Sequence, residues 1–273
     1  MSMRALFGSL LVAMTVASTR VSAGEFVDIE SGSKADPVRL VGYMARPPGA
    51  GPFPAVVLLH GCGGFHSSMI SWADRLSRYG YTALAVDSFG PRGIDERCIG
   101  GFIDQVEDGY AALRYLTTRP FVRASHVAVV GFSQGGWAVL TALEKGLVEQ
   151  RHPEKFRAGI AFYPICQYAS GIVTGPVLVL IGDADTWTPA SACEAMVAGR
   201  SELGAPRKPG DRSSIELVIL PGAHHNFDLL DLSLAPGRGF TSAYGHRVEY
   251  NEEATKTSIA RVRAFLQQTL GAP

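Results

Sequence analysis

The stretch Val127-Ala128-Val129-Val130-Gly131-Phe132-Ser133-Gln134-Gly135-Gly136 decides the fold of this chain. A short β-branched run leads into a G-x-S-x-G motif, and a helix-compatible segment from Trp137 to Leu147 follows it. In a strand–turn–helix of this kind, the serine occupies a tight, strained turn that presents its hydroxyl at the end of a sheet strand. The motif alone is weak in a chain with 31 glycines. Its flanking strand and helix nevertheless favour a nucleophilic Ser133 over an ordinary tight turn.

The residues beside Ser133 suit this role. Gly131 and Gly135 are small, as required where neighbouring backbone crowds such a turn. The backbone N–H of Gln134 opens the following helix, where the helix dipole favours negative charge. The sequence therefore predicts that Gln134 supplies one N–H donor to an oxyanion.

Apolar, strand-like runs alternate with helix-like segments along the chain. The expected strands cover residues 38–45, 55–60, 81–86, 127–130, 158–162, 177–181 and 215–220. The expected helices cover residues 68–79, 104–118, 134–149, 189–203 and 252–270. Several strands are apolar throughout, as in sheets that helices cover on both faces. We expect an α/β fold with a mostly parallel, doubly wound sheet flanked by helices.

The N-terminus is predicted to be a secretory signal peptide. Arg4 precedes a mostly apolar run over residues 5–18, and Val21-Ser22-Ala23 forms a small-residue cleavage site. A membrane anchor is the alternative, but the apolar stretch that ends before Arg20 is short for a spanning helix. We therefore expect cleavage after Ala23, a single domain over residues 24–273, and an exported protein, periplasmic or secreted, with no membrane contact in its mature form.

The charge balance indicates a small-molecule substrate rather than a polyanionic partner. Basic and acidic residues number 25 each, and removal of residues 1–23 takes away two arginines and no acid, which leaves a net charge of −2. Neither a nucleic acid nor an anionic membrane is an expected partner for such a chain. The sequence does not fix the oligomeric state, and a monomer is favoured.

A serine hydroxyl needs a base, and the base needs an orienting carboxylate. In the order serine, acid, histidine, the acid falls in the segment that runs from Gly182 to Pro189, after an expected strand. We favour Asp185, three residues beyond Gly182, with Asp183 as the alternative. A third interpretation is that both aspartates only cap the helix after Pro189.

The base falls in Pro221-Gly222-Ala223-His224-His225-Asn226-Phe227, again after a strand. Only one of two adjacent histidines can readily point at the serine, and we favour His225 over His224. Adjacent histidines also suggest a metal site, but no third ligand stands at a characteristic spacing. We therefore expect neither a metal nor a cofactor.

The second oxyanion donor is expected in Leu58-Leu59-His60-Gly61-Cys62-Gly63-Gly64, where an early strand ends in a glycine-rich loop. Such a loop lets the backbone approach a substrate closely. We assign the N–H of Cys62 as the partner of Gln134. An ordinary turn is the alternative, and Cys62 as a nucleophile is disfavoured because it lacks the elbow.

Five motifs in this order resemble the dienelactone hydrolase family of α/β-hydrolases over roughly residues 38–270. They are the His60–Gly64 turn, Val86-Asp87-Ser88-Phe89-Gly90-Pro91-Arg92-Gly93, the Ser133 elbow, Gly182-Asp183-Ala184-Asp185 and His225-Asn226-Phe227. The resemblance implies a single-domain, cofactor-free hydrolase of esters or lactones. It also supports Asp185 as the acid and His225 as the base.

The chain departs from the family pattern at two positions. Founding members carry cysteine in a G-x-C-x-G elbow and a glutamate beside the oxyanion turn, whereas this chain has Ser133 and, at the matching position, Gly61. Both changes fit an ordinary serine triad. They weaken any transfer of dienelactone as the substrate.

The four cysteines all lie in the exported part, which favours an oxidising compartment, and they lack the C-x-x-C spacing of a zinc site or a thioredoxin-like redox motif. Four cysteines allow three disulfide pairings. In the sheet that the resemblance implies, the strand ending at His60 lies beside that ending at Val86. The strand ending near Phe162 lies beside that ending near Ile181. The loops that follow these strands would bring together Cys62 with Cys98 and Cys166 with Cys193, so we expect these two disulfides.

Two residues are candidates for substrate binding. Arg92 follows a strand end on the active-site side, where an arginine can grip a substrate carboxylate with two hydrogen bonds. The alternative is a local ion pair with Asp95 or Glu96. Trp187 is a candidate pocket residue, although aromatic side chains at such positions are as often core.

The expected activity is hydrolysis of a small ester or lactone through an acyl-enzyme on Ser133. A peptidase or acyltransferase on the same scaffold is one rival, although neither a propeller domain nor a long lid insertion is visible in the sequence. A non-catalytic exported binding protein is the other rival, since a fold alone does not establish activity.

Overall fold

Eight strands form one mixed sheet in the order β1-β2-β4-β3-β5-β6-β7-β8. The computed structural model describes residues 24–30, 37–99, 104–146, 148–229 and 239–271, so the expected signal peptide lies outside the described residues. The strands are β1 (Glu25–Glu30), β2 (Arg39–Ala45), β3 (Phe53–Leu59), β4 (Thr82–Asp87), β5 (Val122–Phe132), β6 (Ala158–Phe162), β7 (Val177–Gly182) and β8 (Ile215–Leu220). β1 pairs with β2, and β2 with β4, in antiparallel register. All other neighbours are parallel.

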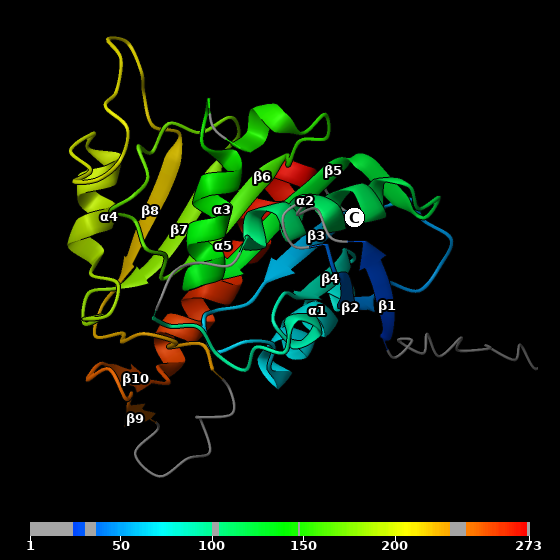
Figure 1. Cartoon of the computed structure of the whole chain (residues 1–273), viewed down its shortest axis with the longest axis horizontal. Coiled ribbons are helices and arrows are strands. Elements are labelled where there is room, and N and C mark those ends of the chain that lie inside the picture. The colour runs from blue at the N-terminus through cyan, green and yellow to red at the C-terminus, as the bar shows by residue number, and fades with distance from the viewer. Residues whose placement is uncertain (1–23, 31–36, 100–103, 147, 230–238, 272–273) are drawn as a thin grey trace, which may run out of the picture.

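Helices cover both faces of this sheet, as Figure 1 shows for α2 and α3 in front of it and α5 behind it. The helices are α1 (Ser67–Arg78), α2 (Gln105–Thr117), α3 (Gln134–Leu143), α4 (Ala190–Val197) and α5 (Glu252–Leu270). Every side chain of β6 and β7 is buried, which explains their uninterrupted apolar sequences. The expectation of a mostly parallel α/β sheet is confirmed.

Local capping chemistry explains where two helices begin. The Asp104 side chain accepts a hydrogen bond from the N–H of Glu107 at the start of α2, at 3.4 Å. Asn251 accepts one from the N–H of Ala254 at the start of α5, at 3.0 Å. Both satisfy amides of the first turn, which have no acceptor within the helix.

Two helices are shorter than the sequence predicts. α3 ends at Leu143 because Glu144 turns to an extended conformation and forms an isolated bridge with Val173. α4 ends at Val197 because its last carbonyls are satisfied by a Schellman motif, in which the N–H of Gly199 bonds to Met196 and that of Arg200 to Ala195.

A two-stranded hairpin of β9 (Gly239–Thr241) and β10 (Arg247–Glu249) lies beyond the carboxyl ends of the parallel strands (Figure 1). The sequence indicates no strand between residues 220 and 252. β10 is tied to the base loop, since the N–H of Glu249 donates to the carbonyl of His225 at 3.3 Å. The hairpin therefore lies against the loop that carries the expected base.

Candidate active site

Ser133 lies on a strained turn between β5 and α3. Its φ of 54° and ψ of −111° place a non-glycine residue in a conformation that costs roughly 1–3 kcal/mol. A Cβ on Gly131 would lie 2.0 Å from the carbonyl oxygen of Gly135, and one on Gly135 would lie 2.3 Å from that of Leu59. Only glycine fits at both positions, so the surrounding backbone holds the serine at the end of β5.

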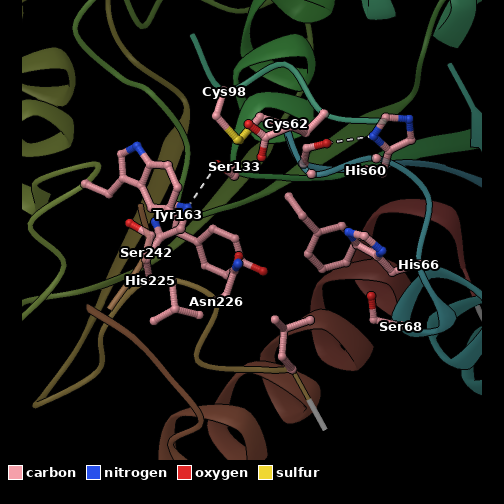
Figure 2. Close-up of a pocket in the computed structure, with 18 of the residues that line it drawn as sticks. His60, Cys62, His66, Ser68, Cys98, Ser133, Tyr163, His225, Asn226 and Ser242 are labelled. Atoms are coloured by element: carbon pink, nitrogen blue, oxygen red, sulfur yellow. Dashed lines mark hydrogen bonds between the residues drawn. A yellow bond between two sulfur atoms is a disulfide. The ribbon is translucent and has the colours of Figure 1, made fainter. Parts of the chain in front are cut away.

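Ser133, His225 and Asp185 form one hydrogen-bonded chain. Nε2 of His225 lies 2.9 Å from Oγ of Ser133, and its Nδ1 lies 2.7 Å from Oδ2 of Asp185. Figure 2 shows His225 and Ser133 together in the pocket, joined by the first of these hydrogen bonds. All three residues are buried, with exposed fractions of 9, 2 and 3% respectively. The structure thus brings together the three residues that the sequence nominated.

The carboxylate of Asp185 is held by three donors besides the histidine. Its Oδ1 accepts from the N–H groups of Trp187 and Thr188, and its Oδ2 accepts from the Thr188 hydroxyl. Burial opposes ionisation of Asp185, but the hydrogen bonds from His225 and Thr188 outweigh it and lower the pKa of the carboxyl below its usual value. Asp185 is therefore held as an anion that fixes the imidazole.

Asp183 and His224, the alternatives for acid and base, lie outside this chain of bonds. Oδ1 of Asp183 accepts from the N–H of Gly222 at 2.7 Å, so its carboxylate ties the acid loop to the base loop. His224 is only half-buried, and its Nδ1 lacks a hydrogen-bond partner among the described residues. The geometry therefore selects Asp185 and His225 over their neighbours.

The loop after β3 is oriented by a buried histidine. The N–H of Ser88 donates to Nε2 of His60 at 3.1 Å, which leaves Nδ1 as the protonated nitrogen, and Nδ1 lies 2.7 Å from the carbonyl oxygen of Gly61. That carbonyl shares a peptide plane with the N–H of Cys62 and points the opposite way. Burial lowers the pKa of His60 to about 4, so the ring keeps this neutral form and fixes the direction of the Cys62 N–H.

Both disulfides have the expected pairing, Cys62–Cys98 and Cys166–Cys193. Figure 2 shows the first beside Ser133, on the wall of the pocket. The second is fully buried and joins the loop after β6 to α4. The first disulfide therefore holds the loop that bears the expected oxyanion donor.

A cavity of about 290 Å³ opens next to Ser133. Its wall includes Trp187, whose ring lies 5.1 Å from that of His225 and stacks on His246. The hairpin closes one side, because the hydroxyl of Tyr244 donates to Glu96 at 2.6 Å across the mouth. Trp187 is therefore a pocket residue, in line with the sequence interpretation.

Arg92 is a correction. Its guanidinium donates two hydrogen bonds to the carboxylate of Asp108 on α2, at 2.8 and 3.1 Å, and both side chains are buried. It is absent from the cavity wall and pairs with neither Asp95 nor Glu96. A buried ion pair of this geometry holds the arginine in the fold rather than offering it to a substrate.

Sequence reasoning missed a buried polar group at the base of the cavity. Asp228 accepts from the hydroxyl of Tyr163 at 2.7 Å and from the indole N–H of Trp72 at 2.9 Å. Asp228 follows the base by only three residues, but its partners come from α1 and from the loop after β6. No spacing rule in the sequence connects these three residues. The only local signal is that a carboxylate lies three residues after the candidate base, His225.

The sheet, the elbow and the Ser133–His225–Asp185 chain define an α/β-hydrolase. The dienelactone hydrolase family model matches residues 40–270. This chain belongs to the dienelactone hydrolase family, and it is a hydrolase that acts on ester bonds.

Similar proteins agree with this assignment. A "probable 2-oxo-3-(5-oxofuran-2-ylidene)propanoate lactonase" from Bradyrhizobium is 26% identical, over 77% of this chain and 86% of its own. Two solved structures share the fold. A dienelactone hydrolase-like promiscuous phosphotriesterase from metagenomic libraries has a TM-score of 0.65 at 22% identity, over 92% of this chain and all of its own. An esterase from Thermogutta terrifontis has a TM-score of 0.61 at 18% identity, over 93% and 95%.

In the part of the chain that the structure describes, His, Cys, Asp and Glu side chains form no group of three suited to a metal ion. Over the same residues, each helix is too short or too polar to span a bilayer.

Proposed function

We propose that the protein hydrolyses a small ester or lactone through an acyl-enzyme formed on Ser133. The observation that carries this proposal is the unbroken hydrogen-bond chain from Ser133 through His225 to Asp185, at 2.9 and 2.7 Å. Distances of this kind are those needed for a base to take a proton from a nucleophile.

In the first step, Oγ of Ser133 attacks the acyl carbonyl while Nε2 of His225 takes its proton. The Asp185 carboxylate stabilises the imidazolium that forms. The N–H groups of Cys62 and Gln134 bind the oxyanion, and His225 then gives its proton to the departing alcohol. In the second step, His225 activates a water molecule, which cleaves the acyl-enzyme and frees Ser133.

A fluorophosphonate probe tests the nucleophile directly. We expect the probe to label the peptide that contains Ser133 and no other serine, as read by mass spectrometry. Ser133→Ala should lose the label and at least ~10³-fold in kcat for an ester substrate. Folded protein that stays unlabelled, or a variant with near-normal turnover, would refute the assignment.

The two aspartates of the acid loop provide a matched pair. Asp185→Asn should lower kcat by about 10³–10⁴-fold, because the amide favours the wrong imidazole tautomer. Asp183→Asn removes a charge two residues away and should stay within about threefold of wild type, since Asp183 bonds only to the backbone of Gly222. Equal losses in the two variants would show that the acid has been misassigned.

We also propose that residues 1–23 are removed on export. The two disulfides support an oxidising destination. N-terminal sequencing of protein recovered outside the cytoplasm should begin at Gly24. A chain that still begins at Met1 would contradict this proposal.

A further inference from the structure

Among the residues that the structure describes, the Asp, Glu, Lys and Arg side chains in the wall of the catalytic cavity are all acidic. Among the described residues that line it, Glu96 and Asp228 carry carboxylates, and lysine and arginine do not occur. The wall is otherwise largely aromatic or aliphatic, with Met69, Phe132 and Phe240 among its members. Such a wall suits an apolar group and offers an anion no opposite charge.

Arg92, which the sequence suggested as the group that binds a substrate carboxylate, is already paired with another carboxylate. Both arms of the Arg92 guanidinium meet the Asp108 carboxylate, with exposed side-chain fractions of 5 and 0%. To reach a substrate, Arg92 would have to leave Asp108 as an unpaired buried charge, which is strongly unfavourable.

Asp228, at the floor of the cavity, also disfavours a negatively charged substrate. Its two oxygens are occupied by Tyr163 and Trp72, so the donors there already have an acceptor. Burial raises the pKa of Asp228 above its usual value, which indicates that its surroundings already disfavour negative charge. In the described part of the wall, a second carboxylate placed nearby would meet neither a lysine nor an arginine.

We infer that the substrate is a small ester or lactone with an uncharged, apolar acyl portion, and that the cavity rejects substrates that bear a carboxylate. This inference rests on the proposed function. The cavity volume of about 290 Å³ lies at the lower end of the range for small-molecule sites, roughly 300–1,000 Å³. It marks a divergence in specificity from the Bradyrhizobium relative, whose name specifies a propanoate, which is a carboxylate.

Three esters of one acyl length separate charge from size and polarity. They are mono-4-nitrophenyl adipate, which is anionic, its uncharged methyl ester, and 4-nitrophenyl 6-methylheptanoate, in which two methyl groups replace the carboxylate oxygens. We expect kcat/KM for both uncharged esters to exceed that for the anionic ester by at least about a hundredfold. An anionic ester within threefold of its methyl ester would overturn the inference.

The origin of the rejection is tested at the mouth of the cavity. Glu96→Gln keeps an oxygen that can accept from Tyr244 but removes the charge. At low salt it should lower the ratio of kcat/KM for the uncharged esters to kcat/KM for the anionic ester about threefold. Glu253→Gln, a surface carboxylate on α5 with 83% of its side chain exposed, is the matched control and should leave the ratio unchanged. A ratio that stays above about a hundredfold in Glu96→Gln and at high salt would assign the rejection to the cost of desolvating the substrate carboxylate rather than to repulsion by Glu96, and the inference would stand.

The outcomes also separate this inference from the proposed function. Every rate is measured beside Ser133→Ala. If none of the three esters shows turnover that depends on Ser133, the hydrolase proposal fails and the inference fails with it. If the anionic ester is turned over through Ser133 as fast as the others, only the inference fails.

Discussion

The loops after β3 and after β6 flank the nucleophile in the same way but are built differently. Both strands pair directly with β5, which ends in the Ser133 elbow. Each loop contains one half of a disulfide. Cys62 is half-buried on the cavity wall, whereas Cys166 and Cys193 are 1% and 0% exposed. A disulfide therefore supports the reacting groups on one side of the elbow, whereas on the other side a disulfide supports the core.

The largest expected effect comes from opening each disulfide in turn. The bonds span 36 and 27 residues, so chain entropy predicts a similar loss for each, about 4 kcal/mol in the free energy of unfolding. Activity should differ. Cys62→Ala with Cys98→Ala should lower kcat about 10- to 100-fold, because the oxyanion N–H loses its fixed position. Cys166→Ala with Cys193→Ala should stay within about threefold.

Urea unfolding and kinetics at a temperature where both double variants are folded provide the measurement. Alanine keeps the backbone N–H at position 62, so the loss reports positioning rather than deletion of the donor. Equal kcat values for the two double variants would remove the functional distinction between the loops.

The pH dependence of the free energy of unfolding tests the role of His60 in the loop after β3. His60 has a pKa of about 4 in the folded protein and about 6.5 when unfolded. Between these values the unfolded chain binds more protons, so stability falls as the pH drops from 6.5 to 4, by about 3 kcal/mol in total. His60→Gln should show a shallower fall over this window in denaturant titrations. Parallel curves for the two proteins would show that His60 does not titrate in this way.

A smaller effect is expected in the loop after β6. Tyr163→Phe deletes the hydroxyl that donates to Asp228 and leaves that buried carboxylate with fewer donors. The free energy of unfolding should fall by about 1–3 kcal/mol, as measured by urea titration at pH 7. Unchanged stability would mean that the Tyr163 hydroxyl does not support Asp228.

Much of the architecture could be predicted because it depends on local pattern. The strands β6 and β8 begin and end where the sequence predicts, at Ala158–Phe162 and Ile215–Leu220. β1 was missed because Glu25–Glu30 is an edge strand with only one fully buried side chain, so its sequence lacks a strong apolar signal. The hairpin was missed because its strands are three residues long.

The active site likewise contains residues that local motifs predict and residues that only the fold brings together. Ser133, Asp185 and His225 each follow a strand end in a recognisable motif, so chain order was enough to nominate them. Trp72 and Asp228 meet across 156 residues of sequence, and no spacing rule connects them. Arg92 was misjudged because its partner, Asp108, lies on the buried face of α2, and the sequence does not show which helix face turns toward the loop after β4.

Because the Cys62–Cys98 bond lies beside the nucleophile, catalytic activity should depend on whether this disulfide has formed. Reduction of this bond frees Cys62 from Cys98, so the loop that bears the expected oxyanion donor loses a covalent constraint. On the proposed mechanism, the protein with this bond reduced turns over its substrate more slowly than the oxidised protein. Recombinant material prepared without oxidation would therefore understate the true activity.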